Sequence, residues 1–199
     1  MTIYLAARFL HVAGALAMFS ALGLEIAMLR GLALARSSSE AHAALAGLRI
    51  HMRIGTVAVL LILVPGAYMA AAAWGMPAWL LAALGALVAI IVLGAGVTRR
   101  LLAAVMPAFE RATDGVEVQQ LLRGLWSSLA ARAVLLLGIV ALMSTKPGGG
   151  EAVLTLGLAA GAAAAAASLA LGRRRAVVPV VAGGADSAAV ALGTHERTP

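Results

Sequence analysis

Long apolar stretches, separated by short polar segments, dominate the chain. They cover residues 4–28, 54–74, 77–97, 124–143 and 152–171. At a rise of about 1.5 Å per residue, a helix of about 20 residues crosses the hydrocarbon core of a bilayer, which is about 30 Å thick. Helices satisfy their backbone hydrogen bonds internally, as lipid requires. The pattern therefore predicts an all-α, polytopic membrane helix bundle with about five transmembrane helices.

The first apolar stretch could instead belong to a secretory signal, because Ala33-Leu34-Ala35 resembles a cleavage site. However, signal peptides place basic residues before a short apolar region. Here the stretch is long and its basic residues follow it. We therefore interpret residues 4–28 as a helix that the mature protein retains.

Basic residues lie in alternate connections between the apolar stretches. The connections at residues 75–76 and 144–151 hold only Lys146, beside Glu151. The positive-inside rule then predicts an N-terminus outside and a C-terminus in the cytoplasm. The basic residues of the other connections and of the tail are Arg30, Arg36, Arg49, Arg53, Arg99, Arg100, Arg111, Arg123, Arg173, Arg174 and Arg175.

The ends of the stretches indicate how the chain is organised. Trp74, Trp79 and Trp126 occupy positions typical of the aromatic belts at membrane interfaces. Residues 173–199 have few bulky side chains, which predicts a disordered cytoplasmic tail after a helical bundle over 1–172. Helical spans also favour a bacterial cytoplasmic (inner) membrane, because outer-membrane proteins are barrels.

Composition agrees with a membrane protein and narrows its chemistry. The chain has 199 residues, of which 63% are hydrophobic and 12% charged, with a mean hydropathy of +1.01. A soluble domain carries about twice that share of charge. The absence of cysteine excludes disulfides and thiolate chemistry. The net charge of +7 comes from residues at the ends of apolar stretches, so we expect no nucleic acid binding.

Caps and prolines predict where the helices begin and end. Ser37 with Glu40, and Asp114 with Glu117, fit capping boxes, so the second and fourth helices should begin before they enter lipid. The third helix should leave the membrane and be limited by Pro107.

Pro65 lies inside the second stretch and predicts a helix kink. Such a kink serves either a gate or the packing of the bundle, and we favour packing.

Small residues recur at the spacing of close helix contacts. Gly157 and Gly161 form such a pair, and so do Gly85 and Ala89. These faces let helix backbones approach closely. They predict tight packing and a homo-oligomer formed within the lipid bilayer.

Charged residues inside the apolar stretches are costly in lipid and therefore informative. Arg132 lies near the middle of the fourth stretch, and Glu25 is the only acidic residue within any stretch. A Glu25–Arg132 pair is feasible, and Arg53 is a competing partner that needs less reach. We favour a structural ion pair for Glu25 over a role in transport or proton transfer.

His11 shares a face of the first helix with Arg8, three residues away. Its imidazole could ligate haem or a metal, relay protons, or form a hydrogen bond with a neighbouring helix, which is the role we favour. His51 differs from His11 by roughly 20 Å in expected depth, which disfavours a haem held by two histidines. A methionine ligand remains open, with candidates Met18, Met28, Met69 and Met143.

Other chemistry has little support in the sequence. His42 and His51 with Glu40 do not match the ligand spacing of a known metal site, so we predict no metal site. The chain has no nucleophile elbow, no phosphate-binding loop and no paired carboxylates within an apolar stretch. We therefore favour a protein without enzyme activity.

The opening run Phe9-Leu10-His11-Val12-Ala13-Gly14 resembles the first helix of a group of small bacterial membrane proteins. The group includes copper-resistance D-type membrane domains, the haem-associated membrane protoporphyrinogen oxidases and several integral membrane families of unknown function. The run from Ser144 to Gly148 is most similar to the last of these. The resemblance covers the first four helices and implies that His11 matches a haem-associated histidine. Lys146 is the only lysine, so those members' lysine in the third helix has no counterpart.

Two functional hypotheses follow. The favoured one is a non-enzymatic, transporter-like or accessory bundle, which predicts that Arg132 and Glu25 lie close together. The alternative is a haem- or porphyrin-linked membrane redox protein that uses His11.

Overall fold

The computed structural model describes residues 2–35, 37–111 and 115–172, with side chains as far as residue 165. Within these ranges the chain forms helices and no strand, which confirms the all-α prediction. The elements are α1 (Ile3–Leu34), α2 (Ser38–Met69), the π-helical turn η1 (Ala70–Trp74), α3 (Ala78–Val92), the π-helical segment η2 (Leu93–Thr98), α4 (Arg99–Arg111), α5 (Val116–Thr145) and α6 (Gly149–Gly172).

In the part of the chain that the structure describes, four helical units are long and apolar enough to cross a membrane: Ile3–Leu34, Ser38–Trp74, Ala78–Arg111 and Val116–Thr145. α6 has 24 residues, and the portion of it whose side chains are described, Gly149–Ala165, is also apolar. The 32 residues of α1 are about 48 Å long at about 1.5 Å each, so helices of this length exceed a hydrocarbon core of about 30 Å. The apolar stretches are therefore the central parts of longer helices.

Helix ends agree with one predicted boundary and contradict another. Ser37 caps α2 as expected, because its Oγ accepts a hydrogen bond from the Glu40 backbone N–H at 3.3 Å. Asp114 lies outside the described residues. The predicted limit at Pro107 is wrong, because α4 continues through Pro107 to Arg111. The carbonyl that loses its donor there belongs to Ala103, an exposed residue, so the missing hydrogen bond is tolerated.

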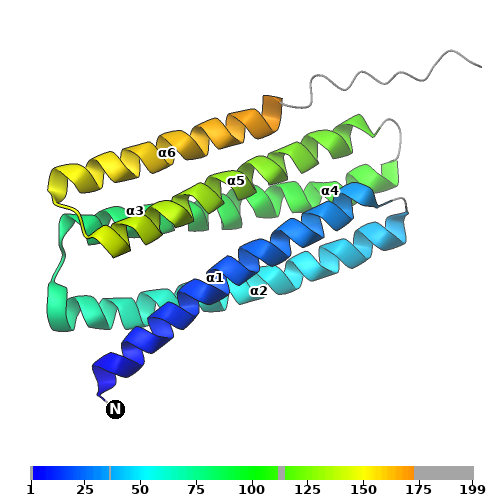
Figure 1. The fold of residues 1–199 in the computed structure, drawn as a ribbon. Coiled ribbons are helices and arrows are strands. Elements are labelled where there is room, and N and C mark those ends of the chain that lie inside the picture. The colour runs from blue at the N-terminus through cyan, green and yellow to red at the C-terminus, as the bar shows by residue number, and fades with distance from the viewer. Residues whose placement is uncertain (1, 36, 112–114, 173–199) are drawn as a thin grey trace, which may run out of the picture.

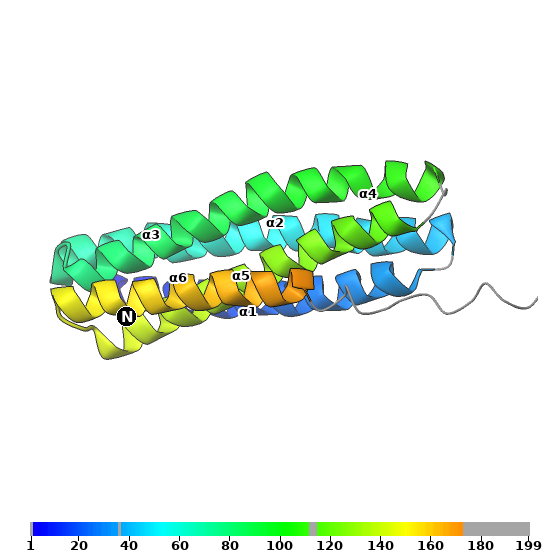
Figure 2. The ribbon, with the colours of Figure 1, turned by 90° about the horizontal axis from the view of Figure 1, so that it is seen from above.

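The helices form two halves (Figures 1 and 2). One half is the antiparallel hairpin of α1 and α2, and the other contains α3, η2, α4, α5 and α6. The halves meet where α1 packs against α5 and where α2 packs against α4. Leu29, Leu32, Leu48 and Leu125, each at most 1% exposed, form the centre of the core.

Close approach within the bundle depends on glycines other than the predicted ones. A Cβ added at Gly14 of α1 would lie only 2.8 Å from the Cβ of Leu61 in α2, and one at Gly138 of α5 would lie 2.7 Å from that of Ala159 in α6. Gly157 and Gly161 have no such neighbour within 4 Å. The predicted pair therefore does not pack helices together in the described part of the chain, and its use between copies stays a prediction.

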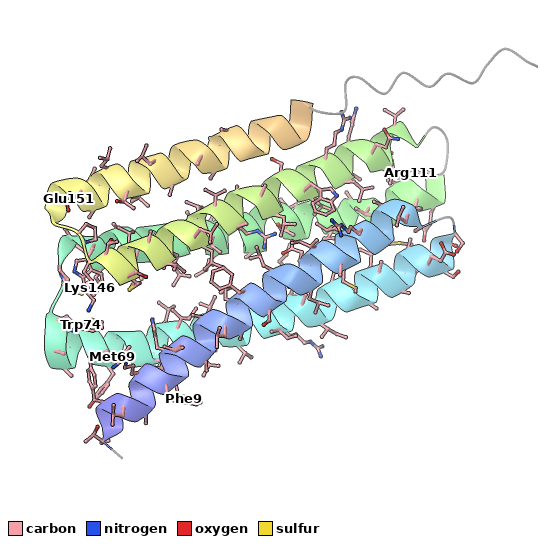
Figure 3. The ribbon with its side chains drawn as sticks, viewed as in Figure 1. Phe9, Met69, Trp74, Arg111, Lys146 and Glu151 are labelled. Carbon is pink, nitrogen blue, oxygen red and sulfur yellow. The ribbon has the colours of Figure 1, made fainter. Side chains whose placement is uncertain are left out.

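Aromatic side chains and a lysine gather at the end of the bundle opposite the α1–α2 connection. The Trp74 and Trp79 rings meet edge to face with centroids 5.7 Å apart. The Lys146 Nζ lies 4.6 Å from the Trp74 ring centroid. Figure 3 shows Lys146, Trp74 and Glu151 at this end, with Arg111 at the other. The contact joins the turn before α3 to the turn before α6.

Candidate functional site

Buried polar side chains from both halves meet inside the bundle. We call Glu25, His51, Thr98, Ser128 and Arg132 the polar layer; each is at most 8% exposed. They come from α1, α2, η2 and α5. Because such groups are costly away from water unless paired, their partners decide what the layer does.

Glu25 is the centre of the polar layer. Its side chain is completely buried, and its Oε1 accepts a hydrogen bond from an Arg132 terminal nitrogen. Its Oε2 lies 3.1 Å from the Nε2 of His51. The structure thus confirms the predicted proximity of Glu25 and Arg132.

Arg53 is not the competing partner of Glu25 that the sequence predicted; His51 takes that place. Two residues along a helix correspond to a rotation of about 200°, so Arg53 and His51 lie on different faces of α2. His51 is buried and Arg53 is exposed. The signal that could have found His51 is the short α1–α2 connection, which places residues at similar distances from the turn side by side. Gly31 faces Ala44, and Gly47 faces Met28, in the same way.

The Arg132 side chain is held along η2. Its Nε donates to the Ser128 carbonyl at 3.3 Å, and its Cδ would lie 3.8 Å from a Cβ added at Gly94. The Thr98 hydroxyl donates to the Leu93 carbonyl, five residues earlier, at 3.2 Å. The Ser128 hydroxyl, 3.0 Å away, then donates to the Thr98 oxygen. The wider π-helical turn and the small Gly94 thus make room for the guanidinium.

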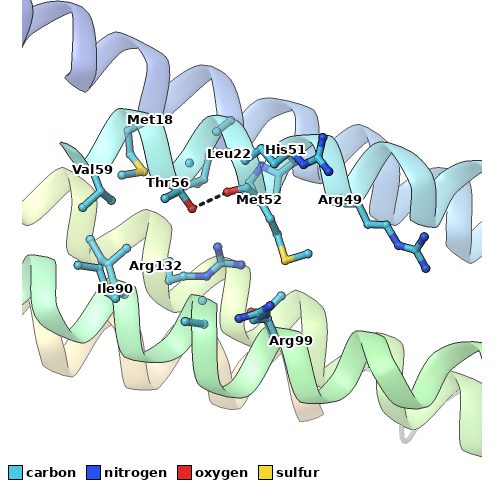
Figure 4. Close-up of a pocket in the computed structure, with 17 residues that line it drawn as sticks. Met18, Leu22, Arg49, His51, Met52, Thr56, Val59, Ile90, Arg99 and Arg132 are labelled. Atoms are coloured by element: carbon cyan, nitrogen blue, oxygen red, sulfur yellow. Dashed lines mark hydrogen bonds between the residues drawn. The ribbon is translucent and has the colours of Figure 1, made fainter. Parts of the chain in front are cut away.

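A cavity of about 480 Å³ lies between α2 on one side and α3, η2 and Arg99 of α4 on the other (Figure 4). Residues of α1 and Arg132 of α5 complete its wall. We call it the basic cavity. Its basic residues are Arg49, His51, Arg53, Arg99 and Arg132, and no acidic residue lines it in the described chain.

The charge of the basic cavity is largely uncompensated. Arg49, Arg53 and Arg99 are exposed residues and have no ion-pair partner among the residues that the structure describes. Arg132 is the exception, because its guanidinium forms an ion pair with Glu25. A concave wall with several cations of one sign creates a positive potential that attracts anions.

His11 lies outside the basic cavity and contacts α2 instead. Its Nδ1 donates to the Ile62 carbonyl at 2.9 Å, and its ring packs on the backbone of Gly66. This is the hydrogen bond to a neighbouring helix that we favoured. Arg8, on the next turn, is exposed. The arrangement gives no support to a haem site at His11.

Pro65 lies on the buried side of α2, in the turn that His11 contacts. Proline removes the donor to the Leu61 carbonyl and weakens this turn. The helix nevertheless continues to Met69 and then widens into η1. His11 therefore donates to the carbonyl next to the one that Pro65 leaves without a donor, while the predicted kink stays a prediction.

His42 and His51 do not act together. His42 Nδ1 donates to the Ser38 carbonyl of its own helix at 2.8 Å, whereas His51 contacts Glu25. The two histidines therefore have separate, structural partners.

These features define a class, a multi-pass helical membrane protein with a basic cavity between its two halves. No family model, no curated protein and no solved structure matches the chain. The resemblance noted for the run from Phe9 to Gly14 therefore stays a prediction.

Proposed function

We propose that the protein is a non-enzymatic, transporter-like or accessory bundle that binds an anion in the basic cavity. The observation that carries the proposal is the lining itself, with four arginines and His51 and no acidic residue among the described lining residues. Arginine is suited to this task because its planar guanidinium binds phosphate or carboxylate through two hydrogen bonds.

The state of Glu25 supports binding over catalysis. A general base needs a free carboxylate or imidazole within reach of its substrate. Both oxygens of Glu25 face Arg132 or His51, and the Nε2 of His51 is directed at Glu25. The Nδ1 of His51 is a fully buried atom, so a ligand in the cavity does not reach it. The ion pair thus holds Arg132 in place at the cavity wall, a structural role.

We place the basic cavity at the cytoplasmic face of a bacterial inner membrane. Arg53 precedes an apolar stretch and Arg99 follows one, so the cavity cations lie at one boundary of the apolar region. Arginines near the ends of transmembrane helices favour the cytoplasmic side. An anion would therefore reach the cavity from the cytoplasm.

Calorimetric titration of the detergent-purified protein with inorganic phosphate, at constant ionic strength, tests the proposal. Arg53→Gln should weaken binding by about ten- to a hundredfold, because a hydrogen bond to a charged group contributes about 1.5–3 kcal/mol. Arg30→Gln is the matched control, since Arg30 is an exposed arginine of α1 outside the cavity.

Equal loss in both variants, or no phosphate binding by the folded wild type, would refute the anion site. If the site does bind phosphate, uptake of labelled phosphate into proteoliposomes would distinguish a carrier from an accessory protein.

A further inference from the structure

We infer that the natural occupant of the basic cavity is an anionic phospholipid of the surrounding leaflet, with its phosphate among the arginines and an acyl chain at the apolar end. This inference rests on the proposed anion site and names the class of its ligand.

Polarity is segregated along the basic cavity. Figure 4 shows Arg49 and Arg99 at one end and Val59 and Ile90 at the other, with Arg132 between them. A small inorganic anion would use only the charged end. A ligand that is anionic at one end and apolar at the other matches the whole wall.

The size and level of the cavity fit a lipid. Its volume of about 480 Å³ is within the roughly 300–1,000 Å³ of sites that enclose organic ligands. Arg53 and Arg99 lie where apolar sequence gives way to polar sequence, the level at which headgroups lie. Basic pockets between transmembrane helices on the cytoplasmic side bind anionic headgroups generally.

The cavity has an opening toward lipid between α2 and α3. No pair of Cα atoms from α2 and α3 lies within 8 Å in the described chain. Thr56 of α2 and Ile91 of α3 both line the cavity and are exposed. An acyl chain can therefore leave the cavity sideways into the bilayer while the headgroup stays between the helices.

The test measures binding of phosphatidylglycerol to the full-length protein in detergent by native mass spectrometry. The comparison ligands are phosphatidylcholine with the same chains and water-soluble glycerol phosphate. Phosphatidylglycerol should bind at least about tenfold more tightly than either, because only it offers both a net charge and a chain. Arg99→Gln should lower its affinity about tenfold. Arg100→Gln, the neighbouring arginine outside the cavity, should leave it unchanged.

A second pair of variants tests the apolar end. Val59→Phe should fill the cavity and weaken lipid binding while leaving glycerol phosphate binding unchanged. Leu60→Phe is its control, because Leu60 is 55% exposed and does not line the cavity.

The outcomes separate this inference from the proposed function. Equal affinity for glycerol phosphate and phosphatidylglycerol would overturn the lipid but keep the anion site. Equal affinity for both phospholipids, or equal effects of Arg99→Gln and Arg100→Gln, would overturn the inference. Either result would show that the lipid binds only nonspecifically, as part of the lipid layer that surrounds any membrane protein. If folded wild type binds neither anion, both proposals fail.

Discussion

At the scale of single residues, Glu25 decides how the interior is built. A carboxylate that is completely buried in a membrane bundle persists only if opposite charges compensate it. Arg132 and His51 approach it from α5 and α2, which belong to different halves of the molecule. The ion pair therefore ties the halves together as well as orienting the Arg132 guanidinium beside the cavity.

Replacing one partner of the pair should destabilise the protein more than replacing both. Arg132→Leu leaves Glu25 without its main partner and should lower the free energy of unfolding by about 3–5 kcal/mol. The double variant Glu25→Leu with Arg132→Leu should recover most of that loss, since no buried charge stays unpaired. The free energy of unfolding, measured by denaturation in mixed detergent micelles, provides the comparison. Additive losses would show that the two side chains act independently.

Lys146 combines an unfavourable backbone conformation with a favourable side-chain contact. It ends α5 in the left-handed region, at φ 46° and ψ 56°, which is unfavourable for a residue with a Cβ. Its N–H bonds the Leu142 carbonyl and its ammonium lies over Trp74. A cation–π contact contributes about 0.5–1 kcal/mol at an exposed site, which offsets part of the strain.

At the scale of elements, the α1–α2 hairpin depends on a close approach at Gly14. The neighbours of an added Cβ include the Leu61 backbone carbon at 2.9 Å, so a larger residue requires the helices to separate. Nothing lies within 4 Å of a Cβ added at Gly23 in the same helix. The packing of the helices therefore requires a glycine at position 14 but not at position 23.

Alanine substitutions should separate these two roles. Gly14→Ala should destabilise the bundle by about 1–3 kcal/mol through overpacking. Gly23→Ala should be neutral or stabilise it by up to about 1 kcal/mol, because alanine favours helix more than glycine does. Thermal unfolding of the purified variants, monitored by far-ultraviolet circular dichroism, measures the difference. Equal stability of the two variants would contradict the close approach.

Prolines within helices make a related point about elements. Pro107 and Pro65 both lie inside helices that continue past them. At Pro107 the freed carbonyl belongs to an exposed residue, and at Pro65 a histidine of α1 donates to the same turn. Whether a proline ends a helix thus depends on neighbours that the local sequence does not reveal.

At the scale of the whole molecule, the orientation in the membrane sets the side from which the basic cavity is reached. The chain has no cysteine, so single cysteines can be introduced without removing native ones. Met76→Cys, in the turn before α3, should react with a membrane-impermeant maleimide added to intact cells. Ser38→Cys, at the start of α2, should react only after permeabilisation, because arginine-rich connections stay in the cytoplasm.

The same assay counts the spans. Ser187→Cys in the C-terminal segment should behave as Ser38→Cys does if α6 crosses the membrane as a fifth span. Labelling of Met76→Cys only in permeabilised cells would reverse the orientation. Labelling of Ser187→Cys in intact cells would leave four spans.

The amino-acid sequence by itself determined that this is a helical membrane protein, because apolar length and hydrogen-bond satisfaction in lipid leave a chain few alternatives. It also indicated the Ser37 cap and the pairing of Glu25 with Arg132, because an isolated buried charge needs an opposite one. It did not reveal His51 as the second partner of Glu25. Nor did it reveal the basic cavity or the glycines at which the helices touch.

Those features depend on which helices are neighbours, on their rotation about their axes and on their register. Only the tertiary structure decides these, because a shift of one or two residues places a different side chain on the shared face. His51 and Arg53 are the clearest case: they lie two residues apart in α2 and both line the cavity, but only His51 is buried against Glu25, whereas Arg53 is exposed.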